Sequence, residues 1–164
     1  MKEEFTIKKI GQINRNEDVF TIELDANYLA GLTGSEGFSH FQVVWWAHLS
    51  DKPENRETLT AGKLFKSAPG EMGIFSTRAP SRPNPLMIST VRVLRIDHVK
   101  GLIYTPFIDA EPCSPVLDIK PFIPGYDTAE EAATPDWLKK ARRKREANQA
   151  ASTEAREHSG LHNV

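Results

Sequence analysis

Two arginines in a proline-rich stretch are the residues of this chain best suited by type and spacing to chemistry. Arg78 and Arg82 stand within residues 73–85, a segment with prolines at 80, 83 and 85. Each proline fixes φ and removes a backbone donor, so we predict a rigid, extended loop between two strands. A guanidinium is a permanently charged fork that binds carboxylate or phosphate. The alternative is a surface turn whose arginines meet only solvent.

Two histidines lie in the most apolar segment, residues 38–49, which predicts a strand buried on both faces. His40 and His48 are eight residues apart, about 26 Å along an extended strand. They cannot bind one metal ion within such a strand, and we predict no metal site. Each is either a hydrogen-bonded histidine of the core or strand end, or part of a separate site.

The glycine-rich stretches do not predict a nucleotide loop. Gly31, Gly34 and Gly37 lack the close first pair of the Rossmann fingerprint. Gly62-Lys63 lacks the upstream glycine and the following Ser or Thr of a Walker loop. Both readings fail on spacing.

The elements that must position these side chains are short strands. Alternating apolar residues predict strands at 5–13, 19–24, 38–49, 86–94, 102–108 and 116–124. Residues 14–18 predict a turn, residues 25–32 a short helical turn, and residues 50–70 a loop. Short strands separated by turns indicate a mainly β fold, and we expect a small antiparallel β-barrel with a C-terminal helix.

The end of the chain is different in character. Thr134 predicts an N-cap, followed by Pro135 at the first helical position. Trp137, Leu138 and Ala141 are expected to dock the helix onto the barrel. Six cations follow, at 139, 140 and 142–145, and such a cluster binds phosphates or forms a solvated helix face. Residues 152–164 are expected to fray. We therefore predict a domain at 1–128 and a basic helix with a flexible tail at 129–164.

Bulk composition restricts the class of protein. The chain has 164 residues, a net charge of −1 and one cysteine, Cys113. A nucleic-acid partner would need a local basic patch, because the overall field is weak. A single cysteine excludes an intramolecular disulfide framework. No apolar run approaches a membrane span, so we expect a soluble cytoplasmic protein without a membrane partner.

Residues 73–85, Gly-Ile-Phe-Ser-Thr-Arg-Ala-Pro-Ser-Arg-Pro-Asn-Pro, resemble the TrmO (TsaA-like, YaeB) family. The stretch 31–41, His48 and the stretch 114–122 agree in the same order, so the resemblance covers about residues 5–127. It implies a small β-barrel that binds S-adenosylmethionine and works as a homodimer. It also implies methylation of N6 of threonylcarbamoyladenosine at position 37 of tRNA.

The resemblance also implies a set of site residues. The positions that would line the cofactor pocket are His48, Leu49, Arg78, Ile88, Pro106, Phe107, Ile108 and Asp109. For the tRNA substrate we expect Arg82, Asn84, Lys120, Arg142 and Arg143. The attacking N6–H must lose its proton, and Asp109, Asp118 and His48 are the candidate acceptors. Asp118 and Lys120 could instead form a pair that fixes a turn.

The chain departs from the family pattern at three places. The early Pro-Arg-Gln-type segment is missing, Met87 stands where glycine is usual, and Pro112-Cys113-Ser114 replaces Asp-Gly-Thr. These changes touch the expected pocket and its mouth. Three other functions therefore stay open: a methyltransferase for another acceptor, a non-catalytic S-adenosylmethionine-binding module, and an RNA-binding module that uses the basic tail.

Overall fold

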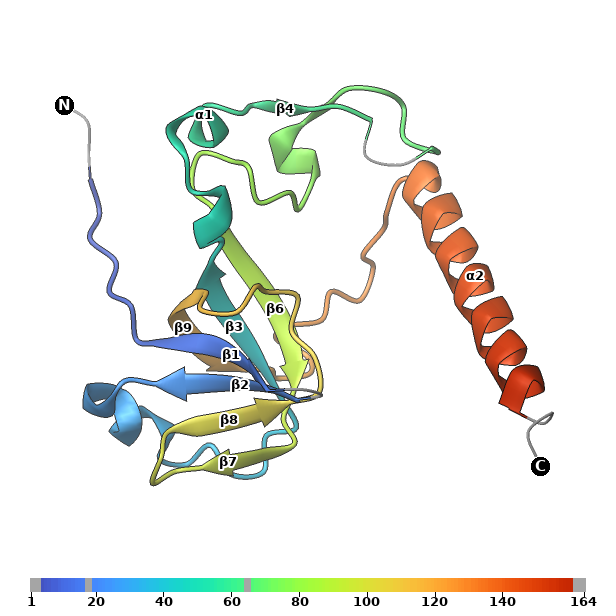
Figure 1. Cartoon of the computed structure of the whole chain (residues 1–164). Helices are drawn as coiled ribbons and strands as arrows, with labels where there is room; N and C mark the ends of the chain where they lie inside the picture. Colours follow the sequence, from blue (N-terminus) through green and yellow to red (C-terminus); the bar gives the residue numbers. More distant parts are fainter. Residues whose placement is uncertain (1–3, 17–18, 64–65, 161–164) are drawn as a thin grey trace. The chain divides into compact units, whose positions relative to one another are not determined.

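The computed structural model describes residues 4–16, 19–63 and 66–160, with side chains described as far as residue 148 (Figure 1). The chain divides into two compact units. The first joins the residues up to Thr58 with Arg78–Thr128, and the second joins Leu59–Thr77 with the chain from Ala129 onward. The predicted domain boundary at residue 128 stays a prediction.

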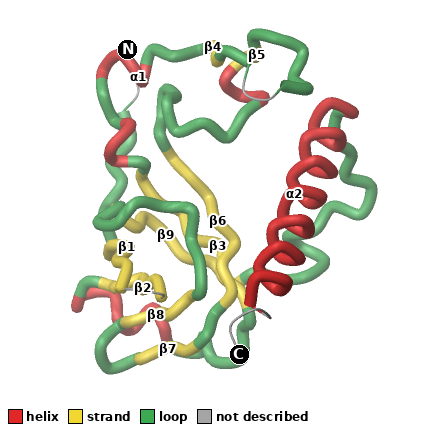
Figure 2. Tube along the Cα trace, turned by 45° about the vertical axis from the view of Figure 1, so that its right-hand side comes forward, coloured by secondary structure: helices red, strands yellow, loops and turns green. Residues whose placement is uncertain are grey.

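Among the described residues, seven strands form one antiparallel sheet in the order β6-β3-β9-β1-β2-β8-β7 (Figure 2). The strands are β1 Gly11–Asn16, β2 Val19–Leu24, β3 His40–Trp46, β6 Leu86–Arg92, β7 Arg95–Asp97, β8 Leu102–Thr105 and β9 Pro115–Pro121. All of them lie in the first unit. The predicted mainly β, antiparallel fold is confirmed.

The predicted closed barrel is not found in the described strand pairings. The two edge strands, β6 and β7, follow one another in the chain and do not pair. A corner at Val93 and Leu94 separates them: Val93 N donates to Ser39 O over 2.8 Å, and Leu94 N donates to Tyr104 O over 2.8 Å. At this corner the chain leaves its contact with the segment before β3 and begins to pair with β8. β6 and β7 therefore do not form the ladder of hydrogen bonds that would close a barrel.

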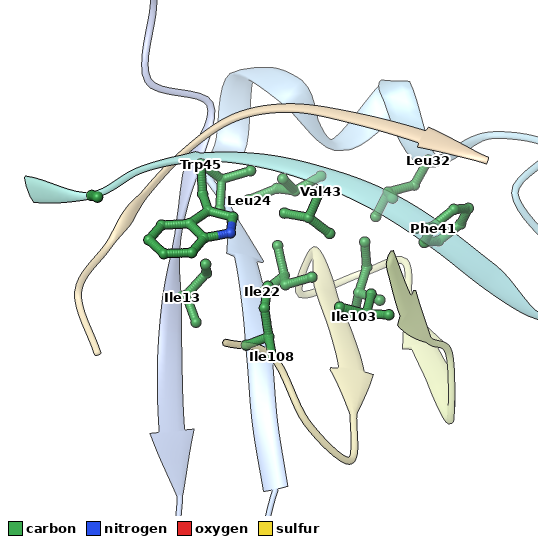
Figure 3. Packing of buried hydrophobic residues seen from close by; sticks show 12 residues of the cluster. Ile13, Ile22, Leu24, Leu32, Phe41, Val43, Trp45, Ile103 and Ile108 are labelled. Carbon is green, nitrogen blue, oxygen red and sulfur yellow. The ribbon is translucent and has the colours of Figure 1, made fainter. Parts of the chain in front are cut away.

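The core follows from alternation along the strands (Figure 3). In β3, Phe41, Val43 and Trp45 are buried, while the residues between them are only half-buried, so the predicted burial of both faces is wrong. Ile13, Ile22, Val43, Ile103 and Val116 are completely buried. Each such side chain contributes about 1.5–3 kcal/mol on burial, so the sheet is held mainly by this one face.

The first predicted strand begins later than expected. Phe5 and Ile7 are 81% and 53% exposed, and β1 starts only at Gly11. Phe5 and Ile7 bury little apolar surface and so give the chain little hydrophobic stabilisation as a strand. Ile13, in contrast, is buried in the core. The predicted turn at 14–18 is wrong over Asn14–Asn16, which belong to β1 and pair with β2, and residues 17 and 18 lie outside the described part.

Other boundaries differ in the first unit. A 3-10 turn, η1 (Ala26–Leu32), confirms the predicted helical turn. β3 ends at Trp46, so His48 lies in a second 3-10 turn, η2 (His48–Ser50), and not on the strand. A short helix, α1 (Pro53–Arg56), interrupts the predicted loop. β8 ends at Thr105, three residues earlier than predicted.

The second unit contains small elements and the long helix. β4 (Thr60–Ala61) pairs with β5 (Met72–Gly73), and the turn η3 (Ile74–Ser76) follows, so the stretch 73–85 is not extended throughout. α2 (Asp136–Gly160) begins one residue later than predicted, because Pro135 O accepts the bonds from Leu138 N and Lys139 N. It continues through much of the segment expected to fray. Residues 161–164 lie outside the described part.

Candidate functional site

A cavity of about 480 Å³ opens in the first unit, and we call it the Arg78 cavity. Its walls come from the ends of β1, β2 and β3, from η2, from residues 78–80, from Met87, and from residues 107–114. A second cavity of about 380 Å³ along β6 shares part of this wall. The shared residues are Trp45, Arg78, Met87, Phe107, Ile108 and Asp109. Both volumes lie in the range of about 300–1,000 Å³ that small-molecule sites occupy.

Arg78 is held at this shared wall by the adjacent strand. Its Nη2 donates to Ile88 O over 3.1 Å, and the side chain is otherwise exposed. One bond fixes the guanidinium, and the fork retains donors for a ligand, because arginine has five N–H groups. Arg82 differs: its Nη1 lies 3.5 Å from Ala79 O and its side chain lines neither cavity.

His48 meets Ser114 across the cavity wall. The distance from Ser114 Oγ to His48 Nδ1 is 3.2 Å, although the two residues are 66 positions apart. Ser114 is completely buried. Its turn is fixed to β1, because Ile13 N donates to Ser114 O over 3.0 Å and Cys113 N donates to Ile13 O over 2.7 Å.

The rest of the wall is apolar with charged groups at its margin. Trp45 is buried and its Nε1 donates to Ser89 Oγ over 3.0 Å. Phe107 is 64% exposed and its ring stands edge-on to Phe20, with 5.9 Å between the centroids. The Cζ of Arg15 lies 5.3 Å from the centroid of Phe20.

Two carboxylates complete the charge at this margin. Asp109 and Glu111 line the Arg78 cavity from exposed positions. The cavity therefore offers two cations and two anions beside apolar surface, a combination suited to a ligand that carries both signs of charge.

A polar cluster beside the cavity fixes η2. Asp51 accepts from Arg56 Nε over 2.5 Å and from Trp46 Nε1 over 2.8 Å. The bond from Arg56 lowers the pKa of Asp51, and the Trp46 indole adds to this effect while burial opposes it. The same bond raises the pKa of Arg56. The cluster anchors the chain that carries His48, since Asp51 N donates to His48 O over 3.3 Å.

The structure brings together most of the residues predicted for the cofactor. His48 and Leu49 line the Arg78 cavity, Ile88 lines the cavity along β6, and Arg78, Phe107, Ile108 and Asp109 line both. Pro106 lines neither. Their roles stay predictions, since proximity alone assigns no ligand.

The remaining predicted residues lie elsewhere. Asp118 lines a separate apolar cavity of about 410 Å³ and forms an ion pair with Lys120, which places it apart from His48 and Asp109. Asn84 is exposed outside the Arg78 cavity. Arg142 and Arg143 are exposed on α2, and Arg142 Nε binds Glu146 Oε1 over 2.8 Å. The roles of Arg82, Asn84, Lys120, Arg142 and Arg143 toward the tRNA substrate stay predictions, and so does the role of Asp118 as a proton acceptor.

Most of the residues that line the Arg78 cavity were not among the predicted site residues, and Arg15, Phe20 and Ser114 are three of them. Arg15 and Phe20 lie on β1 and β2, and Ser114 precedes β9. An Asn- and Asp-rich turn was predicted where Arg15 continues the strand, so its place in a wall was not visible. Ser114 ends the stretch 112–114 that departs from the family pattern and begins the stretch 114–122 that agrees with it, and its hydroxyl was a usable signal.

The residues that the structure describes lack two features of other protein classes. They contain no group of three or more His, Cys, Asp or Glu side chains placed to hold a metal ion. Within the same ranges, none of the helices has the length and apolar character needed to cross a membrane.

Comparison with known proteins gives consistent matches. The family model described as tRNA-methyltransferase O N-terminal domain matches residues 2–128. A probable S-adenosyl-L-methionine-binding protein of Pyrococcus horikoshii is 36% identical over 129 residues, 79% of this chain and 90% of that protein. The human tRNA (adenine(37)-N6)-methyltransferase is 32% identical over 104 residues, 63% of this chain but only 22% of the human protein.

The fold is similar to that of solved structures. A crystal structure of TrmO matches with a TM-score of 0.62 at 25% sequence identity, covering 81% of this chain and 62% of that chain. A crystal structure of TrmO from Pseudomonas aeruginosa matches with a TM-score of 0.60 at 25% identity, covering 80% and 62%. The chain thus spans less than two thirds of these solved proteins.

Proposed function

Because the chain belongs to the tRNA-methyltransferase O N-terminal domain family, we propose that it binds S-adenosylmethionine in the Arg78 cavity and transfers the methyl group to an adenosine of tRNA. The finer proposal for the acceptor is N6 of threonylcarbamoyladenosine at position 37. Two kinds of relative support it: one is named for binding the cofactor and the other for methylating N6 of adenine 37. The observation that carries the proposal is the guanidinium of Arg78, held by Ile88 O at the wall of the cavity.

The residues present fit the chemistry of this cofactor. Its α-carboxylate matches a guanidinium fork, for which Arg78 and Arg15 are available. Its ribose hydroxyls and ammonium need acceptors, and the Asp109 and Glu111 carboxylates line the same cavity. Its adenine needs apolar surface, which Met87, Ile108 and Trp45 provide.

When bound, the cofactor supplies an electrophilic methyl group on a sulfonium. The chain's part is then to hold the acceptor nitrogen in line with that methyl, since alignment supplies much of the rate. The exposed ring of Phe107 offers a face on which a nucleobase can stack. The Arg78 cavity shares lining residues with the cavity along β6, which is the side from which we expect the acceptor to approach.

A titration tests the cofactor site. Isothermal titration calorimetry of the protein with S-adenosylmethionine should show binding that weakens about tenfold or more in Arg78→Ala, equivalent to about 1.4 kcal/mol. Arg82→Ala is the matched control, because it removes a guanidinium outside the cavity and should bind like wild type. Equal weakening in both variants, or no binding to wild type, would contradict the proposed site.

The transfer step needs a separate assay. Radiolabelled methyl should pass to tRNA that carries threonylcarbamoyladenosine, and not to the same tRNA in which position 37 is guanosine. The competing function is a non-catalytic S-adenosylmethionine-binding protein, which is favoured by archaeal relatives named only for binding. Cofactor binding without transfer to any tRNA would select that function. The homodimer implied by the family resemblance stays a prediction.

A further inference from the structure

The contact between His48 and Ser114 gives one ring nitrogen a fixed partner. Ser114 Oγ lies 3.2 Å from Nδ1, and the serine is completely buried. Its backbone is also held: Ser114 N donates to Glu111 O over 3.2 Å, and Ser114 O accepts from Ile13 N over 3.0 Å. The backbone bonds to β1 and to Glu111 therefore fix the position of the Ser114 hydroxyl. The imidazole contacts this hydroxyl through Nδ1.

The backbone of His48 is anchored as well. His48 O accepts from Asp51 N over 3.3 Å, and Asp51 is bound by Arg56 and Trp46. The ring thus has a fixed main chain and a fixed Nδ1 contact while its side chain lines the Arg78 cavity. Nε2 is the nitrogen left for a ligand.

A neutral imidazole has one donor nitrogen and one acceptor nitrogen, and the bond to one determines the role of the other. If Nδ1–H donates to Ser114 Oγ, then Nε2 carries the free lone pair. We propose that Nδ1–H donates to Ser114 Oγ, that His48 Nε2 accepts the proton that the attacking nitrogen loses during methyl transfer, and that Ser114 is the residue that positions the ring for this step. The proposal rests on the proposed function.

The nitrogen lone pair forms the new bond to the methyl carbon while the carbon–sulfur bond breaks, and its electron pair stays on sulfur, which becomes a neutral thioether. The N–H electron pair stays on the nitrogen as its proton moves to Nε2. The resulting imidazolium still donates from Nδ1 to Ser114 Oγ.

The other candidate acceptors are less well placed for this task. Asp118 lines a different cavity and is bound by Lys120. Asp109 lines the right cavity but from an exposed position, where a carboxylate is hydrated and free to bind cofactor hydroxyls. His48 alone of the three combines a place in the cavity wall with a buried side-chain partner.

The first test reads the ring directly and needs no substrate. In ¹⁵N spectra of the histidine-labelled full chain, the His48 signal is identified by its loss in His48→Asn. We expect a neutral ring with the proton on Nδ1 in wild type and in Ser114→Thr, and a mixture of tautomers in Ser114→Ala. A proton on Nε2 in wild type would overturn the proposal, whatever the protein's activity.

The second test measures transfer with the same variants. His48→Asn keeps a polar atom near the Nδ1 position but has nothing at Nε2, so we expect a kcat about 100-fold lower than that of wild type when both are saturated with S-adenosylmethionine. Ser114→Ala should lower kcat about tenfold, and Ser114→Thr should restore it. Asp109→Asn is measured in the same assay, because Asp109 is the other candidate proton acceptor that lines the Arg78 cavity.

The outcomes separate the two proposals. An inactive wild type would refute the proposed function and the proton-acceptor role with it. An active wild type with an equally active His48→Asn would refute only the role of His48. Loss of transfer in Asp109→Asn alone, at saturating S-adenosylmethionine, would assign the proton to that carboxylate instead.

Discussion

Asp51 is a residue outside the Arg78 cavity that determines where His48 stands. Replacing it with asparagine removes the charge that binds Arg56 and Trp46. The pair is partly exposed, with side-chain accessibilities of 28% and 42%, so screening by solvent limits its value. We expect Asp51→Asn to lower the free energy of unfolding by about 1 kcal/mol at pH 7.

The pH dependence of this effect has a definite sign. The folded pKa of Asp51 lies below its unfolded value, so its stabilisation is complete above about pH 4 and is lost as the pH falls through the lowered folded pKa. Urea unfolding at pH 7 and at pH 3 should therefore show a smaller difference between wild type and Asp51→Asn at pH 3. A difference that grows on acidification would contradict this account. Asp136→Asn, whose partner is Lys139 on the exposed α2, is the control.

Some single residues of the candidate site could be predicted from the sequence, because the residue type alone limits the chemistry that its side chain can perform. Arg78 could be identified because prolines at 80, 83 and 85 follow it, and a guanidinium in a stiff loop is well suited to bind an anion. Arg15 was not, since the side chain enters the wall only when β1 and β2 continue to Asn16 and Val19. That Asp118 lines a different cavity from His48 could not be predicted, because distance across a sheet cannot be read from order along a chain.

At the scale of elements, β1 and β2 approach each other too closely for a side chain at one point. A Cβ added to Gly11 would lie 2.2 Å from Glu23 O, which is a backbone atom that cannot move without disturbing β2. We expect Gly11→Ala to lower the free energy of unfolding by about 1–3 kcal/mol, as overpacking does. Thermal or urea unfolding measures it.

The control for that substitution is another glycine with open space. A Cβ at Gly31 would meet nothing within 4 Å, so Gly31→Ala should leave stability unchanged or slightly raise it. If both substitutions destabilise equally, backbone crowding at Gly11 is not the cause.

Strand bounds were predicted well where apolar residues alternate in the sequence between clear turns. β2 and β6 were found in this way, and their bounds differ little from expectation. The segment before Gly11 alternates as well, yet Phe5 and Ile7 remain exposed, because nothing in the described chain covers them. The corner at Val93 and Leu94 contains no Gly, Pro, Asn or Asp, so the sequence did not predict a turn there.

At the scale of the whole molecule, the net charge of −1 means that attraction to RNA must be local. The cations of α2 supply such a patch, and if they contact tRNA, each neutralised phosphate adds about 0.7–0.9 to the slope of log K against log salt. Replacing Arg142 and Arg143 with alanine should therefore weaken tRNA binding and reduce that slope by about 1–2.

Filter binding at several salt concentrations measures this slope. Lys8→Ala with Lys9→Ala removes the same charge from another exposed segment and is the control. S-adenosylmethionine affinity should be the same in both double variants. An unchanged slope in the Arg142 and Arg143 variant would mean that α2 is only a solvated helix.

The position of β9 in the sheet has a consequence for how the protein folds during its synthesis. β9 is the last strand of the chain, yet it lies between β3 and β1 and is the strand that joins the pair β6-β3 to the group β1-β2-β8-β7. During synthesis, a nascent chain that stops before Pro115 can form only these two part-sheets, each with an unpaired edge. Ribosome-arrested chains ending before Pro115 should be cut readily by protease, and chains long enough to expose Pro121 outside the ribosome should resist. Protease resistance of chains that end before Pro115 would show that the part-sheets are stable alone. Resistance that begins only once Pro121 is exposed would show that β9, the strand made last, completes the sheet.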